Sequence, residues 1–311
     1  MTAEARIPWL AADPAAQRVL ELAGKVADTS TTVLITGESG TGKDQLARLI
    51  HELGPRRDAP YLKIDCASLP QDLVESELFG HERGAFTGAV DRKLGRLEMA
   101  GDGTIVLDEV AALSPATQSK LLRVLEERSF ERLGGTETLS IEARIIALTN
   151  ADLTRAVSAG LFREDLYFRL SVLTIRVPAL RERPADILPL AEHLLARLAA
   201  VHGRPEATLS EASRKALQSY EWPGNIRELR NFIERALVFA KNSVLEPSEF
   251  PDKIHGNAFA AAGKMRSLEE IEREVIQATL EATHYKISRS AEILGISRKT
   301  LLDKRKRYGL H

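Results

Sequence analysis

The sequence has few of the residues that mark extracellular or membrane proteins. It contains one cysteine, Cys66, in 311 residues. No disulfide can therefore form within the chain, and a reduced, cytoplasmic location is expected. It has no run of about 18 uninterrupted apolar residues, so we expect no membrane insertion. Residues 1–17 carry acidic residues and two prolines but no apolar segment of a signal peptide.

Aromatic residues are also scarce, at 5%, yet apolar material is not. Hydrophobic residues make up 44% of the chain and charged residues 28%, which is the composition of an ordinary globular protein. Enough apolar side chains are present to bury a core, and this excludes disorder as the main state. At about 150 residues per domain, the length predicts roughly two domains.

The net charge of −1 conceals an uneven distribution of charge along the chain. Residues 284–311 carry a net charge of +6, and the preceding 283 residues carry −7. A basic tail on an acidic body indicates an anionic partner for the tail, with nucleic acid as the first candidate. A solvated helix face is the alternative that charge alone leaves open.

The first half of the chain alternates between strand and helix patterns. Short β-branched runs predict strands at 33–36, 61–65, 104–107, 144–149 and 172–177. Helical periodicity predicts helices at 14–27, 43–53 and 118–128. Strands that alternate with helices predict an α/β core with a mostly parallel sheet flanked by helices. Residues 130–141, with Gly134 and Gly135 in the middle, predict a β-hairpin insertion.

After Pro178 the strand signal stops and helices follow. They are expected at 187–201, 210–220, 225–241 and 268–283, with Ser210 and Ser267 as N-caps. Residues 255–264 show no clear period and contain two glycines, so they are interpreted as part of a linker. The expected domains are therefore 1–178 (α/β nucleotide-binding), 179–254 (helical lid), 255–267 (linker) and 268–311 (C-terminal, all-α).

A phosphate-binding loop is predicted between the first strand and the second helix. It is formed by Gly37, Glu38, Ser39, Gly40, Thr41, Gly42 and Lys43, which match G-x-x-x-x-G-K. Glycines let backbone N–H groups converge on phosphate oxygens, and the following helix adds its N-terminal dipole. A glycine-rich turn without a ligand is the alternative, but the strand, lysine and helix together favour the phosphate site.

Three further carboxylates bear on metal binding and hydrolysis. Asp44 stands where the general motif has Ser or Thr as a Mg²⁺ ligand, which leaves the metal geometry open at this position. Asp108 and Glu109 follow the strand at 104–107 and lie where ligands bind in open α/β sheets. Asp108 is expected to hold Mg²⁺ and Glu109 to polarise the attacking water, so the two motifs together indicate NTP hydrolysis.

Between these motifs lies a loop with small residues around one aromatic and one hydroxyl side chain. It consists of Gly84, Ala85, Phe86, Thr87, Gly88 and Ala89, preceded by Glu-Leu-Phe-Gly-His-Glu. Taken alone, the pattern is typical of an ordinary flexible loop. The six residues resemble the signature loop of bacterial enhancer-binding proteins, the AAA+ activators of sigma-54 RNA polymerase. The version Gly-Glu-Ser-Gly-Thr-Gly-Lys also resembles that family's own phosphate loop, in which an acidic residue after the lysine is common.

The resemblance extends along nearly the whole chain and implies roles for four more residues. Thr149-Asn150 resembles sensor I, the segment 162–170 resembles that of the arginine fingers with Arg163 and Arg169, and Trp222-Pro-Gly-Asn-Ile-Arg227 resembles sensor II. It implies an AAA+ fold that binds ATP and Mg²⁺. It also implies a ring, expected to be a hexamer, in which the arginine fingers reach the neighbouring subunit's nucleotide. The loop at 84–89 would contact sigma-54.

Two positions depart from the family pattern. Asp102-Gly103 stands where the family usually has two glycines. Asp65 ends the second strand where the family often has Asn, which can hold the catalytic glutamate in an inactive pose. Two adjacent carboxylates, Asp65 and Glu109, would repel unless a proton, water or metal lies between them.

The basic tail predicts a helix-turn-helix motif. Residues 288–294 and 298–307 are expected to be helices joined by Gly295-Ile-Ser297. The segment resembles the Fis-type DNA-binding domain that ends this family's members.

The second helix is the one expected in the major groove. The expected DNA-binding residues are Ser297, Arg298, Lys299, Thr300, Lys304 and Arg305. A basic helical oligomerisation tail is the alternative. About 40 residues are too few for a solitary stable domain, so pairing with a second copy through 268–283 is expected.

The sequence therefore predicts a sigma-54-dependent activator with ATPase activity. Its expected partners are sigma-54 RNA polymerase, enhancer DNA and further copies of itself. Family members often begin with a receiver or sensory domain, whereas here the AAA+ pattern starts near Met1. Control by a separate regulator or co-activator, or by expression level, is expected. An AAA+ remodeller of another target and a DNA-binding regulator with an inactive NTPase core are the competing functions.

Overall fold

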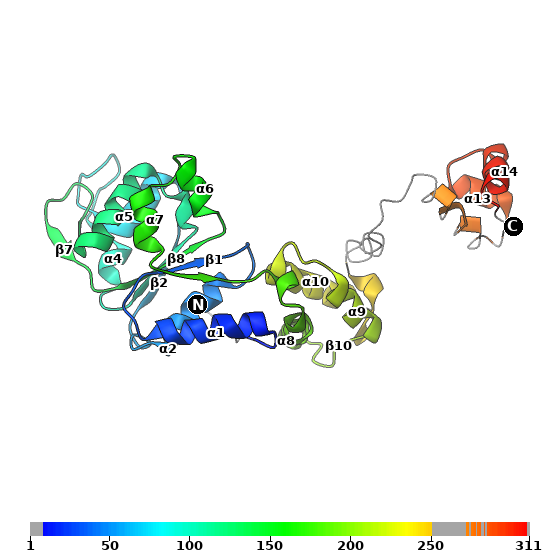
Figure 1. The fold of residues 1–311 in the computed structure, drawn as a ribbon, viewed down its shortest axis with the longest axis horizontal. Helices are drawn as coiled ribbons and strands as arrows, with labels where there is room; N and C mark the ends of the chain where they lie inside the picture. Colours follow the sequence, from blue (N-terminus) through cyan, green and yellow to red (C-terminus); the bar gives the residue numbers. More distant parts are fainter. Residues whose placement is uncertain are drawn as a thin grey trace. The chain divides into compact units, whose positions relative to one another are not determined.

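The computed structural model describes residues 9–250, 272–273, 275–277, 279–280, 283 and 285–309. The chain separates into two compact units, residues 1–255 and 256–311 (Figure 1). The first unit contains a parallel sheet and a set of lid helices, and the second contains the basic helices. The two units are described separately below.

A five-stranded parallel sheet forms the centre of the first unit. Its strand order is β2-β5-β8-β1-β9. The strands are β1 (Val33–Thr36), β2 (Tyr61–Asp65), β5 (Thr104–Asp108), β8 (Arg144–Thr149) and β9 (Leu173–Arg176). The register pairs Asp65 with Asp108 and Thr36 with Thr149, so the carboxyl ends of these strands meet at one edge of the sheet.

Helices cover both faces of this sheet (Figure 1). They are α1 (Pro14–Ala27), α2 (Lys43–Leu53), α3 (Gln71–Phe79), α4 (Arg96–Met99), α5 (Pro115–Glu127), α6 (Leu153–Ser158) and α7 (Glu164–Leu170). Val33 and Ile35 of β1 pack in one core with α1 and α2. Leu34 packs in a second core with α3, α5 and α7. Alternate residues of each strand point to opposite faces, so a continuous apolar run serves both cores.

Two short antiparallel pairs project from the core. β3 (Gly80–His81) pairs with β4 (Lys93–Leu94), and β6 (Ser129–Glu131) pairs with β7 (Thr138–Ser140). The first pair carries the loop at 84–89. The second is the hairpin that Gly134 and Gly135 predict.

The lid part of this unit is helical and has its own core. It contains α8 (Ile187–Val201), α9 (Glu211–Ser219) and α10 (Asn225–Phe239), together with the short parallel strands β10 (Thr208–Leu209) and β11 (Val244–Leu245). Single 3₁₀ turns of the lid lie at Leu180–Glu182, Pro184–Asp186 and Pro247–Glu249, and another lies after β5 at Val110–Ala112. Trp222 is fully buried in the lid core with Phe232 and Leu229. Its indole N–H donates to the carbonyl oxygen of Leu217, which satisfies the buried polar group.

The second unit contains α13 (Ile287–Ile293) and α14 (Arg298–Arg307). Its small core is formed by Ile276, Leu280, Ala291 and Leu301. Gly295, in the turn between the helices, has φ of +63°, a conformation in which glycine avoids the steric cost of a Cβ atom. Ser297 caps α14 by accepting the backbone N–H of Thr300 at 3.0 Å.

The predicted fold class is confirmed. The structure adds helices that the sequence patterns do not predict, among them α3, α6 and α7, and further differences lie at element ends. Helix α5 begins at Pro115, three residues before the predicted start, because Ser114 caps it and proline suits the first helical position. Strand β9 is one residue shorter at each end, and α10 ends at Phe239. The predicted linker at 255–267 and the N-cap at Ser267 lie outside the described residues. None of the described helices is long and apolar enough to span a membrane.

Candidate nucleotide site and remodelling loop

The phosphate loop takes its shape from three glycines between β1 and α2. Gly37, Gly40 and Gly42 have φ of +150°, +78° and +102°. A Cβ atom at Gly40 would lie 2.5 Å from the carbonyl oxygen of Gly224 in the lid. Side chains at these positions would be strained or would clash, so glycine is needed for the loop to close beneath the lid.

Lys43, the first residue of α2, is folded back onto this loop. Its ammonium group donates to the carbonyl oxygens of Gly37 at 2.7 Å and Glu38 at 3.3 Å. Burial lowers the pKa of Lys43, while Glu109 and Asp108 act in the opposite direction. The loop carbonyls therefore satisfy a buried cation at the helix N-terminus, where phosphate oxygens are favourable partners.

Asp108 and Glu109 lie at the carboxyl end of β5, beside this lysine. Glu109 adopts left-handed backbone angles, with φ and ψ both 52°. Its Oε1 lies 3.9 Å from Lys43 Nζ, and its Oε2 accepts the backbone N–H of Asn150 at 3.0 Å. The predicted general base is thus held between the phosphate loop and the end of β8.

The two carboxylates that bear on metal binding share one lysine. Lys63 of β2 places Nζ 2.5 Å from Asp44 Oδ1 and 2.7 Å from Asp108 Oδ2. Burial acts to lower the pKa of Lys63, but its hydrogen bonds to Asp108 and Asp44 outweigh this and raise it. Sequence reasoning did not identify Lys63, because a single lysine on an edge strand carries no signal of its own.

The donor set fits the Mg²⁺ that the family resemblance implies. Asp108 presents carboxylate oxygens, the hard donors that Mg²⁺ prefers, from a side chain 15% exposed. Asp44 adds a second carboxylate from the first turn of α2. The remaining coordination positions would be left for phosphate oxygens and water, which is the usual arrangement for this ion.

Asp65 is directed into its own turn. Its Oδ1 accepts the backbone N–H groups of Ala67 at 3.0 Å and Ser68 at 3.1 Å. Glu109 accepts a hydrogen bond from Asn150 and forms an ion pair with Lys43. Each of the two carboxylates thus has separate hydrogen-bonding partners, which reduces the repulsion expected from the sequence.

The lid contacts the phosphate loop through Glu38. Arg181 pairs with both carboxylate oxygens of Glu38, at 2.9 and 2.5 Å. The Arg181 hydrogen bonds, assisted by Asn225, lower the pKa of Glu38 to about 2. Such bidentate guanidinium–carboxylate pairs fix orientation as well as charge.

Asn225 links three segments at the base of the lid. Its Nδ2 donates to Glu38 Oε2 at 3.2 Å and to the Ser39 carbonyl oxygen at 3.0 Å, and its Oδ1 accepts the N–H of Leu180 at 2.7 Å. The side chain is fully buried and the backbone has φ of +52°. Asparagine tolerates this region better than most residues. The sequence placed this residue inside the sensor II motif but assigned it no role.

Three further contacts join lid and loop. Arg227 donates to Ser39 Oγ at 2.7 Å, and the backbone N–H of Ile226 donates to the Gly40 carbonyl oxygen at 3.0 Å. The buried Arg183 donates to the Thr41 carbonyl oxygen at 2.7 Å. The lid therefore contacts the phosphate loop at consecutive residues, and Arg227 lies beside Ser39 of that loop.

The two arginines of the predicted finger segment contact α5 and α7. Arg163 pairs with Asp165 at 2.7 Å and donates to Ser119 Oγ at 3.1 Å, and its side chain is 45% exposed. Arg169 donates to the carbonyl oxygen of Leu125 at 3.0 Å. Both are held at the surface by contacts outside the phosphate loop of their own chain.

The loop at 84–89 is folded across the end of the β3–β4 pair. Gly84 N–H donates to the Ala89 carbonyl oxygen at 2.8 Å, which closes the loop at its base. Phe86 is 44% exposed, and its ring lies edge-on to His81 with centroids 4.9 Å apart. Thr87 and Gly88 are exposed. Six residues thus present an aromatic ring and a hydroxyl group to a partner.

The base of this loop is fastened to the β6–β7 hairpin. The nearly buried guanidinium of Arg132 pairs with Glu82 at 2.9 Å, Glu98 at 2.8 Å and Glu137 at 2.8 Å. The hydrogen bonds to Glu98, followed by those to the other two carboxylates, raise the pKa of Arg132. These three ion pairs therefore join the base of the loop at 84–89 to the hairpin and to α4.

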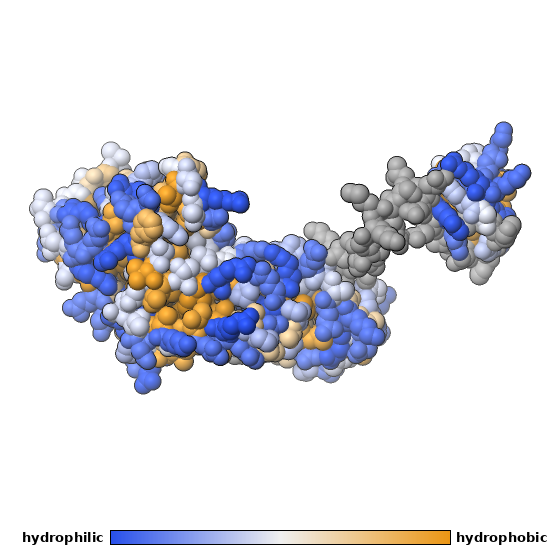
Figure 2. All heavy atoms as spheres, in the orientation of Figure 1, coloured by the Kyte–Doolittle hydropathy of each residue, from blue (hydrophilic) through white to orange (hydrophobic). Residues whose placement is uncertain are grey.

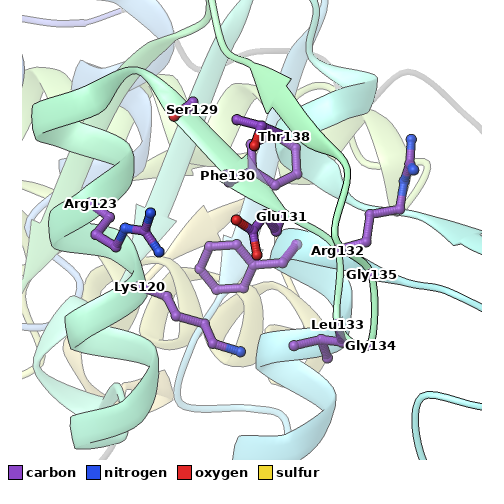
Figure 3. Close-up of a pocket in the computed structure, with 11 residues that line it drawn as sticks. Lys120, Arg123, Ser129, Phe130, Glu131, Arg132, Leu133, Gly134, Gly135 and Thr138 are labelled. Atoms are coloured by element: carbon purple, nitrogen blue, oxygen red, sulfur yellow. The ribbon is translucent and has the colours of Figure 1, made fainter.

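A cavity of about 200 Å³ lies between this hairpin and α5. Figure 3 shows Lys120 and Arg123 reaching from α5 toward the hairpin strands. Their carboxylate partners are Glu75 and Glu127 respectively. The cavity is separate from the phosphate loop and shares none of its lining residues with it.

The predicted DNA-binding residues lie on or next to α14. Arg298 and Lys299 are exposed, whereas Lys304 pairs with Glu272 at 2.6 Å and Arg305 lies over the ring of Tyr285. The Ser297 hydroxyl caps the helix, so this side chain already has a structural role. Figure 2 shows hydrophilic side chains over the described residues of this unit.

Known proteins match nearly all of the chain. Residues 9–176 match the sigma-54 interaction domain family, 181–267 the AAA+ ATPase lid domain, and 267–308 the Fis family of bacterial regulatory proteins. The alginate biosynthesis transcriptional regulatory protein AlgB of Pseudomonas aeruginosa is 46% identical over 96% of this chain and 66% of its own length. The transcriptional regulatory protein ZraR of Salmonella typhimurium is 44% identical over 96% of this chain and 68% of its own length.

A solved structure agrees in fold. NtrX from Brucella abortus in complex with ATP has a TM-score of 0.73 and 35% identity, and the match covers 98% of this chain and 70% of that one. The sigma-54 interaction domain alone accounts for more than half of the sequence. With its lid and Fis-type helices, the chain belongs to the family of sigma-54-dependent transcriptional activators.

Proposed function

We propose that this protein is an ATP-driven activator that opens promoters bound by sigma-54 RNA polymerase. ATP is bound at the phosphate loop and hydrolysed between subunits of a ring, expected to be a hexamer. The loop at 84–89 presses on sigma-54, and the C-terminal helices hold the ring at enhancer DNA. The observation that carries the proposal is the pairing of Lys43 with Glu109 in a chain that also presents Phe86 and Thr87.

The residues around Lys43 would divide the chemistry among themselves. The Lys43 ammonium would leave the loop carbonyls and bind the β- and γ-phosphates. Glu109 would orient the attacking water and accept its proton, while Asn150 would position Glu109 and the water. Asp108 would hold Mg²⁺, and when bound this ion supplies positive charge against the charge of the phosphates.

Two further groups respond to the γ-phosphate. Arg163 and Arg169 would stabilise its transition-state charge from the neighbouring subunit, which makes hydrolysis depend on assembly. Arg227 would release Ser39 and bind the nucleotide instead. The position of α10, which carries Arg227, would then depend on which nucleotide is bound.

The DNA-binding role is supported by the charge and cap of α14. Exposed Arg298 and Lys299 lie in its first turn, the end that contacts base edges and phosphates in helix-turn-helix proteins. Lys304 and Arg305 lie further along the helix. We propose that pairing with a second copy places two such helices on one enhancer site.

The test is open-complex formation by purified sigma-54 holoenzyme on a supercoiled promoter. The protein is added with ATP in one reaction and with a non-hydrolysable analogue in another. Opening with ATP alone supports the proposal. Absence of opening despite measurable ATP hydrolysis contradicts it for this protein acting alone, and repeating the assay with candidate partners then separates a missing co-activator from a different target.

A further inference from the structure

Lys63 of β2 joins α2 and β5 at the metal side of the candidate site. It lies in the middle of β2, opposite Val106 of β5 in the register, and its side chain extends along the sheet to the end of β5. There its ammonium contacts Asp108 Oδ2 at 2.7 Å and Asp44 Oδ1 at 2.5 Å. The Lys63 side chain is 35% exposed, so it has open space into which it can withdraw.

Charge explains why a cation is held at this position. Asp108 and Asp44 come from different elements, and their carboxylates converge on one point. Two carboxylates this close repel unless a positive charge lies between them. Asp108 is only 15% exposed, which weakens solvent screening of that repulsion. The Lys63 ammonium provides the positive charge when no divalent cation does.

We propose that Lys63 is an internal cation that competes with Mg²⁺ for Asp108. A divalent ion on Asp108 and an ammonium 2.7 Å from the same carboxylate repel each other, so the ion binds only as Lys63 withdraws from Asp108. Lys63 thereby suppresses metal binding in the absence of nucleotide. The phosphates supply the additional negative charge that favours the exchange. The inference rests on the nucleotide site of the proposed function.

The first test measures how strongly Mg²⁺ tightens nucleotide binding in the full-length protein. The affinity for a fluorescent ADP analogue is determined in EDTA and in millimolar Mg²⁺. The affinity in Mg²⁺ divided by the affinity in EDTA is then compared among variants. Lys63→Met is expected to increase this ratio about fivefold or more, because the competitor is lost. Lys63→Arg keeps the charge and is expected to stay within twofold of the parent.

A matched control comes from Lys120→Met, which removes a surface lysine that pairs with Glu75 away from the phosphate loop. Its ratio is expected to equal that of the parent. An unchanged or reduced ratio in Lys63→Met overturns the inference, because it means that Lys63 is either a simple surface pair or a support for Asp108. Affinity in EDTA shows separately whether the phosphate loop is intact in each variant.

The second test needs no nucleotide. Thermal unfolding is followed with and without Mg²⁺ alone. Lys63→Met is expected to gain about 2 °C or more from the ion, because Asp44 and Asp108 repel once the lysine is removed. The parent is expected to gain less than half of that. Equal shifts in the two proteins contradict the inference.

Neither test involves polymerase or hydrolysis, so failure of this inference is distinguishable from failure of the proposed promoter opening. Loss of all nucleotide binding by the parent would contradict the proposed function instead.

Discussion

Lys43 Nζ and Glu109 Oε1 lie 3.9 Å apart, and each group is also held by backbone. Lys43 donates to two carbonyl oxygens of its own loop, and Glu109 accepts an N–H from the end of β8. Lys43 and Glu109 are therefore each held in place by backbone groups. Under the proposed function, phosphate would replace the loop carbonyls as the partner of Lys43, and this exchange would change the groups that surround Glu109.

Glu109→Gln should separate nucleotide binding from hydrolysis. The amide keeps the size of the side chain and its contact with Asn150 but cannot accept a proton. ATP hydrolysis is expected to fall by about 10²-fold or more, with nucleotide affinity within threefold of the parent. Phosphate release and fluorescent-nucleotide titration measure the two quantities. Hydrolysis near the parental rate would assign the base to another residue.

Thr87→Ala tests the loop without touching the nucleotide site. Thr87 is exposed at the tip of a loop closed by the Gly84–Ala89 hydrogen bond. Removal of its hydroxyl should leave ATP hydrolysis unchanged and abolish open-complex formation. The two assays are run on the same preparation, with exposed Ser219→Ala in the lid as the control. Retention of both activities would exclude the loop assignment.

The arginine fingers predict complementation between subunits. Arg163→Ala is expected to reduce ATP hydrolysis by about 10³-fold while nucleotide binding is retained. Mixed rings of Arg163→Ala and Glu109→Gln contain sites with an intact Glu109 on one chain and an intact Arg163 on its neighbour. Mixing the two inactive variants should therefore restore hydrolysis. A mixture as inactive as its components would place Arg163 outside the neighbouring site.

Much of the architecture was predictable, because its signals are local. The bounds of α1, β1, α2 and β8 were predicted from apolar runs that end at clear glycine, proline or charged positions. The phosphate loop has a fixed spacing between a strand and a helix, so the motif itself located it. The loop at 84–89 was located by its resemblance to the signature loop of the family. Helix α5 was predicted to begin late, although Ser114-Pro115 carried the signal for its true start.

The remaining parts of the site depend on tertiary register and could not be predicted in this way. Lys63 becomes important only because β2 lies beside β5, and the order of strands is not written in the spacing of motifs. Asn225 and Arg181 meet Glu38 only when the lid folds over the loop. Long-range contacts such as these bring together residues far apart in sequence, and no local pattern marks them.

The Glu38–Arg181 pair predicts a defined dependence of stability on pH. The pKa of Glu38 is lowered to about 2, so the pair contributes stability above the unfolded value near 4.5 and loses it as the pH falls toward 2. Both side chains are over 40% exposed, and the coupling free energy of unfolding should be only about 0.5–1 kcal/mol at pH 7.

A double-mutant cycle with Glu38→Gln and Arg181→Met measures this coupling by urea unfolding at pH 7, 5 and 3.5. The coupling should be equal at pH 7 and 5 and smaller at pH 3.5, because Glu38 begins to protonate in the unfolded state below its ordinary pKa. A coupling that grows as the pH falls would have the wrong sign for a depressed carboxyl pKa and would exclude this pair as its source.

Asn225 should be among the most sensitive residues of the lid. Its buried amide makes three hydrogen bonds to the phosphate loop and to Leu180. Asn225→Ala removes these hydrogen bonds. It also places alanine at φ of +52°, a left-handed conformation that asparagine tolerates better. The free energy of unfolding, followed by tryptophan fluorescence in urea, is expected to fall by about 2–4 kcal/mol. Nucleotide affinity should fall as well, because Glu38 and Ser39 lose a support.

Asn225→Gly separates the two causes, because glycine also lacks the amide but accepts the left-handed backbone. Asn225→Gly should be less destabilised than Asn225→Ala by about 0.5–1 kcal/mol. This difference is the strain of alanine in the left-handed conformation minus the larger chain entropy that glycine loses on folding. Nucleotide affinity should fall equally in the two variants, since both lack the contacts to the loop. If glycine restored parental affinity, backbone geometry alone would couple the lid to the phosphate loop, and the hydrogen bonds of Asn225 would have no part in it.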